Sequence, residues 1–528
     1  MPRNWQTVVA QLLPAALLGA VAFALALIIT DPPGPGLDPD ALAYMGAAES
    51  LAAHGDYRIP TAKWASADST SALAHFPPAY STMLALPVRL GMTPPQAARL
   101  VQALAAALTV ATLVLLVSAA TTPLAGMLLA VALFAMTSMH EVHASVLSEP
   151  VYLACTALVL AAMVRVPNRP LSAGIPAAVG VMTRYVGASL VGAVVLWQLA
   201  QRGPWRVRLR RAVVAALPTI VVQGAWVLRT RAVAGAGEIR KLAIYGDLHP
   251  TLAQGAATFT AWLIPHPGTS TEPLPHRGVL AFAAGCALLA LVTIGVFQTW
   301  RMIRNETAQR RRSESDGSHG NDRILSSESG ALPLITAAAL LILAYVGVVL
   351  VSRLLADPNI PLDERILAPV LLLVMTIAAT GVSLWWRATR LDIARIAVCG
   401  ALLGWWCASA TSTLAEVRYA LDWGSDFAGE QWRHSELLTW ARSDGAGVPL
   451  YTNWPSAVYF YLHRPAHELP TRRDARTLAA FADTVRIRGG RVLLFDVQTT
   501  EFAPRDSLLK VRGLRILARV RDGTVLSQ

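Results

Sequence analysis

The chain has 528 residues, of which 54% are hydrophobic and only 15% are charged. Soluble domains carry about 25% charged residues on average, so this composition excludes an ordinary soluble protein, although the length would suit several soluble domains. The formal net charge of +12 does not indicate a nucleic-acid partner, because the arginines cluster beside long apolar runs, as cytoplasmic membrane anchors do.

Eleven apolar segments are predicted to cross a membrane as helices, each long enough alone or together with its flanks. The first is predicted to be a retained helix and not a cleaved signal, because Asp31-Pro-Pro-Gly is not a small-residue cleavage site. The pair at 171–183 and 185–200 is short and is interrupted at Thr183-Arg184. The predicted spans are 9–30, 97–119, 122–138, 147–164, 171–183, 185–200, 211–228, 278–300, 331–353, 364–386 and 393–412.

The arginine clusters between these spans predict the orientation. If every cluster is cytoplasmic, the N-terminus lies inside, the C-terminus lies outside and the protein resides in the cytoplasmic membrane. Three polar regions then face outward, at 31–96, 229–277 and 413–528. The polar, Ser-rich segment 301–330 faces inward and has the composition of a disordered linker.

The tail differs in kind from the rest of the chain. The expected fold is mainly α: a multi-pass transmembrane helical bundle of about eleven spans over residues 1–412, with a small extracytoplasmic α/β domain over residues 413–528. Hydrophobic periodicity in the tail predicts helices, short buried strands and a hairpin around Asp522-Gly523. The helices are Glu430–Ala441 and Asp474–Val485, and the strands are Val448–Thr452, Arg491–Val497, Leu514–Val520 and Thr524–Leu526.

The first external loop carries the most informative residues. Acidic residues follow the first membrane helix, a short helix then ends at Gly55 as its C-cap, and a double proline leads back toward the bilayer. The residues in question are Asp38-Pro39-Asp40, Tyr44, Gly55-Asp56-Tyr57, Pro60 and His75-Phe-Pro77-Pro78-Ala-Tyr80.

This loop resembles the GT-C superfamily of polyprenyl-phosphate-dependent glycosyltransferases, above all the protein O-mannosyltransferases and the aminoarabinose transferases. In that family an acidic residue is followed by a tyrosine four residues on, a Gly-Asp-aromatic step and a proline. Asp40, Tyr44, Gly55-Asp56-Tyr57 and Pro60 match this order. Weaker matches are Ser148-Glu149-Pro150, Thr183-Arg184-Tyr185, Leu362-Asp-Glu-Arg365 and Tyr451-Thr-Asn453-Trp-Pro455.

The resemblance implies a membrane enzyme that takes a sugar from a polyprenyl-phosphate donor and inverts the sugar carbon. It implies that the general base is Asp40, whose spacing to Gly55 matches the family. Asp38 is the other candidate for this role. A carboxylate can take the acceptor's proton. Arginine suits the departing lipid phosphate because its planar fork pairs bidentately with phosphate.

The residues predicted to bind substrate have plainer alternatives. Arg184 could extend to the interface as a long cation does, Arg365 could pair only with its acidic neighbours in the chain, and Tyr44 could only pack its helix. Arg229 stands at an external helix end, where a long loop weakens the positive-inside rule. The predicted substrate-binding set is Tyr44, His75, Glu149, Arg184, Arg229 and Arg365.

No cofactor is predicted. Glu141, His143 and Glu149 are donors that a divalent metal could use, but their spacing is not diagnostic. The four cysteines lie within apolar segments without paired spacing, so they predict neither disulfides nor a metal site. Asn453 before Trp454-Pro455 is predicted to be a helix N-cap.

The expected partners are a polyprenyl-phosphate-linked sugar donor, an acceptor that the sequence does not identify, and the lipid bilayer, with no nucleic acid. A transporter or lipid flippase is the main alternative from another class. It would favour inverted repeats and broken helices near the midplane, and no repeat is visible in the sequence. A catalytically inactive scaffold of the same family is the third alternative.

Overall fold

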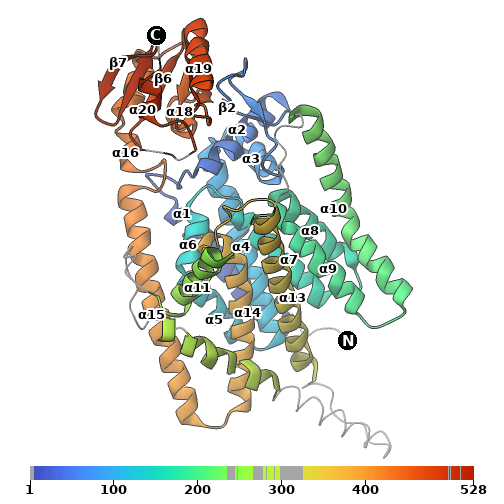
Figure 1. Cartoon of the computed structure of the whole chain (residues 1–528). Helices are drawn as coiled ribbons and strands as arrows, with labels where there is room; N and C mark the ends of the chain where they lie inside the picture. Colours follow the sequence, from blue (N-terminus) through green and yellow to red (C-terminus); the bar gives the residue numbers. More distant parts are fainter. Residues whose placement is uncertain are drawn as a thin grey trace, which may run out of the picture.

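The computed structural model describes residues 5–234, 244–245, 248–265, 278–280, 282–290, 292–297, 325–497, 499, 501–511 and 513–528. Residues 301–324 of the predicted linker at 301–330 lie outside the described residues. Over the described residues the chain is mostly helical, with a strand-containing unit at its C-terminal end (Figure 1).

Several helices are long and apolar enough to cross a membrane. By length and composition, seven helices in the described part of the chain qualify, and one of them is Gly278–Phe297. The count rises to eight if α5 (Pro123–Phe134) and α6 (Thr137–Ala144), which are bent by 65° relative to each other, form one span. The other six lie within α1 (Trp5–Ile29), α4 (Pro94–Ala120), α10 (Trp205–Ala234), α13 (Leu325–Leu355), α14 (Glu364–Ala388) and α15 (Asp392–Trp423).

The difference from eleven predicted spans lies in the middle of the chain. The apolar runs there form α7 (Glu149–Arg165), α8 (Pro170–Thr183) and α9 (Ala188–Ala200), of 17, 14 and 13 residues. A span needs about 20 residues, so these helices are too short by length alone, and the count of eleven stays a prediction.

The core lies where α4, α7, α13 and α14 pack together, with Leu113, Leu160 and Leu334 fully buried. In Figure 1 these helices stand at the centre, while α10 and α15 run along opposite edges. The outer helices expose large apolar side chains, for example Ile220 and Leu403, each more than 60% exposed. A soluble protein rarely presents such a surface, whereas a bilayer covers it.

The first loop folds into short elements above this bundle (Figure 1). Its main helix, α2 (Pro39–His54), begins with Asp38 as N-cap. It ends, as predicted, at Gly55, which has a φ of 77°. It is followed by β1 (Arg58–Ile59), β2 (Thr61–Ala62), β3 (Ser71–Ala72) and α3 (Ala79–Arg89). A side chain at Gly46 would collide with the ring of Pro60, so the loop closes tightly over α2.

Five strands of the tail and β2 of the first loop form a six-stranded sheet of order β2-β5-β4-β6-β8-β7. The first four strands are parallel, and β8 and β7 add an antiparallel hairpin. The strands of the tail are β4 (Leu450–Thr452), β5 (Ala466–Glu468), β6 (Arg491–Phe495), β7 (Arg515–Val520) and β8 (Gly523–Ser527). Its helices are α16 (Glu430–Arg433), α17 (Glu436–Ser443), α18 (Pro455–Leu462), α19 (Ala475–Arg488) and α20 (Arg505–Leu509).

Two predictions for the tail were wrong in detail. The helix predicted at Glu430–Ala441 is broken into α16 and α17, because the Ser435 side chain accepts a hydrogen bond from Leu438 N and starts a second helix. Asn453 is not an N-cap. Its amide instead donates to the carbonyl of Phe495 at 3.0 Å and accepts from the N–H of Phe495 at 3.0 Å, joining β4 to β6.

The first loop supplies one edge of the tail's sheet. Strand β2 pairs in parallel with β5, with Thr61 opposite Ala466 and Ala62 opposite His467. The division of the sequence at residue 412 did not anticipate this contribution. The sheet therefore connects the first loop and the tail, which lie side by side in Figure 1.

Candidate functional site

The candidate site forms where the starts of three helices meet around one guanidinium group. Arg365 is the second residue of α14, a helix that Asp363 caps by accepting from Ile366 N at 2.8 Å. Arg365 donates to three carboxylates from distant parts of the chain: Asp38, Asp40 and Glu149. Arg365 therefore pairs with carboxylates that are distant in the chain, whereas the plainer alternative named only its acidic neighbours.

Asp38 and Asp40 hold different positions at the start of α2. One oxygen of Asp38 accepts the backbone N–H of Asp40 at 2.9 Å, and the other accepts from Arg365 Nη1 at 3.2 Å. Both Asp38 oxygens are therefore engaged. Asp40 lies in the first turn, and its Oδ2 accepts from Arg365 Nη2 at 2.8 Å. Its side chain is 31% exposed, so water or a substrate can reach the carboxylate.

Glu149 joins two arginines from inside the protein. It is the first residue of α7, its side chain is only 2% exposed, and it pairs with both Arg184 and Arg365. Arg184 lies between α8 and the short 3-10 helix η1 (Tyr185–Gly187), in an extended conformation with φ of −147°. Arg184 therefore turns inward to a buried carboxylate and does not extend to an interface.

Tyr44 closes the inner side of this group through Ser148. The hydroxyl groups of Tyr44 and Ser148 lie 3.2 Å apart, and Arg184 Nη1 donates to Ser148 Oγ at 3.3 Å. The ring of Tyr44 is buried against Phe76 and Tyr80. His75 packs edge-on against Phe76, which places it one layer behind Tyr44.

Arg229 lies in a different environment from the other predicted residues. Its guanidinium donates to the backbone carbonyls of Leu73 and Tyr57. It also lies over the ring of Trp226, with Cζ 4.7 Å from the centroid. These contacts attach α10 to the first loop, so the structure does not bring Arg229 together with the arginines around Glu149.

The electrostatics of the group raise the pKa of one carboxylate above its ordinary value. Asp38, Asp40 and Glu149 together carry one negative charge more than Arg184 and Arg365 when all are ionised. Burial, reinforced by the neighbouring charge of Asp40 and opposed by Arg365, raises the pKa of Asp38 to about 6. Burial also raises the pKa of Tyr44, so this phenol stays neutral at physiological pH.

The residues that a metal could use are scattered. In the described ranges, no group of three or more His, Cys, Asp or Glu side chains has a geometry that could hold a metal ion. Glu149 is committed to two arginines, and His143 Nδ1 lies 2.7 Å from the carbonyl of Met139 on its own helix.

Sequence reasoning missed Asp426, which borders the same region. It lies in the turn after α15 with φ of 51° and forms a parallel bridge with Leu37. Burial raises its pKa and Arg365 opposes the shift. The only sequence signal was the pair of glycines, Gly424 and Gly429, that bracket the turn.

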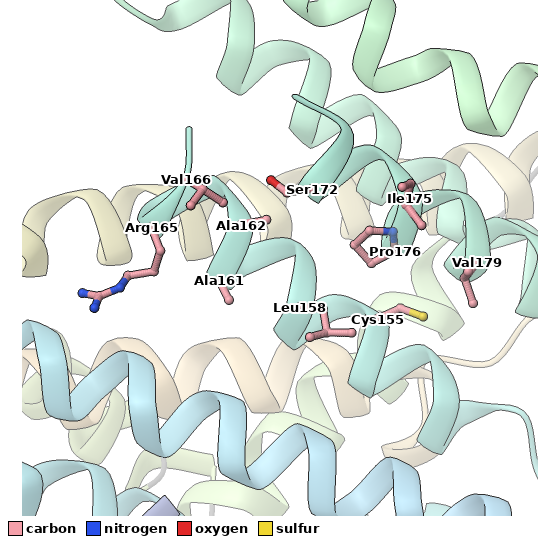
Figure 2. A pocket seen from close by; sticks show the side chains of 10 residues that line it. All are labelled: Cys155, Leu158, Ala161, Ala162, Arg165, Val166, Ser172, Ile175, Pro176 and Val179. Atoms are coloured by element: carbon pink, nitrogen blue, oxygen red, sulfur yellow. The ribbon is translucent and has the colours of Figure 1, made fainter. Parts of the chain in front are cut away.

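A cavity lies along two short helices near the site. It has a volume of about 490 Å³, lies between α7 and α8 and is lined almost wholly by apolar side chains, as Figure 2 shows. Cys155 and Val179 lie toward one end of it and Arg165 toward the other. Cys155 follows Glu149 by six helical residues, about 9 Å along the axis. The apolar cavity thus begins close to the buried ion pairs.

Comparisons with known proteins give structural likenesses only. No family model and no curated protein matches the chain. Similar solved structures include ArnT from Cupriavidus metallidurans in the apo state, with a TM-score of 0.49, 14% identity and 97% of both chains covered. They also include the arabinofuranosyltransferase AftD from Mycobacteria (TM-score 0.45, 15% identity, 97% of this chain and 41% of that one).

A third similar structure is an oligosaccharyltransferase from Archaeoglobus fulgidus (TM-score 0.46, 12% identity, 90% of this chain and 68% of that one). Two of the three are sugar-transferring enzymes by name.

Proposed function

We propose that this protein is a membrane glycosyltransferase that moves a sugar from a polyprenyl-phosphate donor to an acceptor on the outer side of the cytoplasmic membrane. The observation that carries the proposal is the convergence of Asp38, Asp40 and Glu149 on Arg365, with Arg184 behind Glu149. This arrangement offers a reachable carboxylate beside cationic groups, at the boundary between apolar helices and a polar loop.

In the proposed reaction Asp40 accepts the proton of the acceptor's hydroxyl or amine. The freed electron pair forms a bond to the sugar's anomeric carbon, while the bond from that carbon to the phosphate oxygen breaks. The polyprenyl phosphate departs with the electron pair. Attack from the face opposite the phosphate inverts the anomeric carbon.

The arginines have separate proposed roles. Arg365 donates from Nε, Nη1 and Nη2 to three carboxylates, so its proposed role is to orient the acidic side chains. Arg184 uses only Nη1 in its contacts with Glu149 and Ser148. Its remaining donors suit the phosphate. The lipid chain would lie in the apolar cavity between α7 and α8, where Ile175 is 55% exposed.

Substitution of Asp40 tests the proposal. Asp40→Asn keeps the shape of the side chain but cannot take a proton, so transfer from a radiolabelled polyprenyl-phosphate sugar should fall by about 10²- to 10⁴-fold. Asp68→Asn is the matched control, because Asp68 is an exposed carboxylate of the same loop that also pairs with an arginine, Arg58. This variant should retain full transfer.

Asp38 is the second candidate for the base. Its pKa of about 6 lies nearer to neutrality than the ordinary value of 3.8, which favours proton transfer. Its role as N-cap and the engagement of both its oxygens favour a structural role instead. Loss of transfer in Asp38→Asn but not in Asp40→Asn would exchange the two roles. Full transfer in both variants would mean that neither aspartate is the base. Lipid movement without turnover of the sugar donor would support the transporter or flippase alternative.

A further inference from the structure

A recess lies beside the candidate base, between the end of α15 and the tail. Its volume is about 700 Å³, within the range of about 300–1,000 Å³ typical of ligand pockets. Its lining includes Pro39, Tyr419, Trp423, Asp426, Gln431 and Trp454. Pro39 stands between Asp38 and Asp40 in the chain, so the recess is lined by a residue adjacent in the chain to the one that we propose as the base.

The walls of the recess are fixed by contacts from three directions. The turn at Asp426 forms a bridge with Leu37, and Phe427 N donates to Leu37 O at 3.3 Å. The indole N–H of Trp454 donates to Val497 O at 2.8 Å, which fixes the orientation of its ring. The first loop, the end of a membrane helix and the tail thus build one concave surface.

The chemistry of the lining fits a sugar. Aromatic rings pack against the apolar C–H faces of a pyranose or furanose ring, while carboxylate and amide oxygens accept hydrogen bonds from its hydroxyl groups. Tyr419 and Trp423 are 63% and 53% exposed and lie near the end of a membrane helix, where aromatic side chains also serve as interfacial anchors. Interfacial anchoring does not account for Trp454 and Gln431, which belong to the tail and line the same recess.

We propose that this recess binds a saccharide, the glycan part of the acceptor. The proposal rests on the proposed function and deepens it by naming the class of acceptor. A glycan held against Trp423 and Gln431 would extend past Pro39 and present a hydroxyl group to Asp40. A peptide is the alternative occupant of the recess, and binding to sugars or to peptides distinguishes the two.

The test is direct binding of sugars to the full-length protein. Fluorescently labelled protein, in a detergent without a sugar headgroup that would compete, is applied to an array of oligosaccharides and to an array of peptides. Dissociation constants are then measured for the best-binding oligosaccharide. Trp423→Ala and Gln431→Ala should each weaken binding by about tenfold or more, as expected for anchor residues in a pocket. The Tm and elution volume of each variant establish that it is folded.

Trp205→Ala is the matched control, because Trp205 is 61% exposed on a membrane helix and does not line the recess. Its binding should equal that of the parent protein. The proposal is overturned if no oligosaccharide binds, if the two recess variants bind as the parent does, or if peptides bind there instead. Sugar transfer without glycan binding would overturn only this inference, and glycan binding without turnover of any polyprenyl-phosphate sugar would overturn only the proposed function.

Discussion

The start and the middle of the first loop are held in place by different kinds of interaction. At its start, Asp38 and Asp40 are bound to the helical bundle by ion pairs with Arg365. Further on, β2 is bound to the tail by backbone pairing with β5, and Trp64 packs edge-on against Phe481 of α19. Arg488 adds hydrogen bonds to the carbonyls of Ser66 and Ala65.

The kind of contact differs with the role that we propose for each part of the loop. Charged contacts lie where we propose that the acceptor's proton and the lipid phosphate bind. These contacts depend on one another because Arg365 and Glu149 are shared. Backbone and apolar contacts lie where the loop needs only to be held. We therefore expect the start of the loop to tolerate few substitutions and the tail side to lose function gradually.

The largest effect should come from Glu149→Gln. Removing this buried charge leaves Arg184 and Arg365 without their shared partner, which typically costs about 3–5 kcal/mol. The expected result is a Tm well below that of the parent protein together with loss of transfer. Glu436→Gln is the control, because Glu436 pairs with Arg521 on the surface at 3.7 Å and such pairs contribute at most about 1 kcal/mol. Equal Tm values for the two variants would contradict the central role of Glu149.

The next effect concerns the stability contributed by Asp38, and its sign is unusual for a carboxylate with an arginine partner. The folded state raises the pKa of Asp38 from 3.8 to about 6, so the folded protein binds this proton more tightly than the unfolded chain does. Its favourable contribution is complete below about pH 4 and is lost as the pH rises through about 6. At pH 7.5 the ionised side chain costs up to about 3 kcal/mol.

Asp38→Asn should therefore raise the Tm at pH 7.5, since asparagine caps a helix as well as aspartate does. The gain should vanish when both proteins are measured near pH 4. A lower Tm for the variant at pH 7.5 would mean that the ion pair with Arg365 outweighs the burial of the charge. Thermal unfolding in detergent across this pH range decides between the two.

The sequence was sufficient to select most of the charged group. Arg184 was selected because it interrupts an apolar run, where a charge needs a specific reason to be present. Asp38, Asp40, Glu149 and Arg365 were selected through the resemblance of their motifs. The C-cap of α2 at Gly55 was also predictable, since capping depends on a few neighbouring residues.

The tail side could not be predicted in the same way. Strand β2 has two residues, too few to show any periodicity, and its partner β5 is some 400 residues away in the chain. Arg229 was grouped with the substrate-binding residues for a related reason. Its partners are the backbone carbonyls of Leu73 and Tyr57, and every residue has a carbonyl, so the sequence does not identify such partners. Asp426 was missed because its bridge with Leu37 is likewise a backbone contact.

A smaller effect is expected from Trp64→Ala, which weakens the tail's hold on the loop. Trp64 is partly buried, so the loss should be about 1–3 kcal/mol, less than for a core tryptophan. Protease cleavage within residues 58–72 should accelerate and transfer should fall in parallel. Trp440→Ala is the matched control, because Trp440 is also partly buried but packs within the tail. A fall in transfer for Trp440→Ala alone would show that the contact between loop and tail does not position the site.

The smallest effect should come from Tyr459→Phe, which removes the one hydroxyl group by which α18 contacts Glu49 on α2. Glu49 is half-buried, so water can replace the phenol and the loss should be about 1 kcal/mol. Tyr461→Phe removes a comparable hydrogen bond, from Tyr461 to the carbonyl of Phe427 at 2.6 Å, which lies within the tail and its connecting turn. The two variants should have similar Tm values, but only Tyr459→Phe should lower the transfer rate, because only Tyr459 holds the helix that begins with Asp38 and carries Asp40. Equal transfer rates would mean that the ion pairs with Arg365 fix α2 without help from the tail.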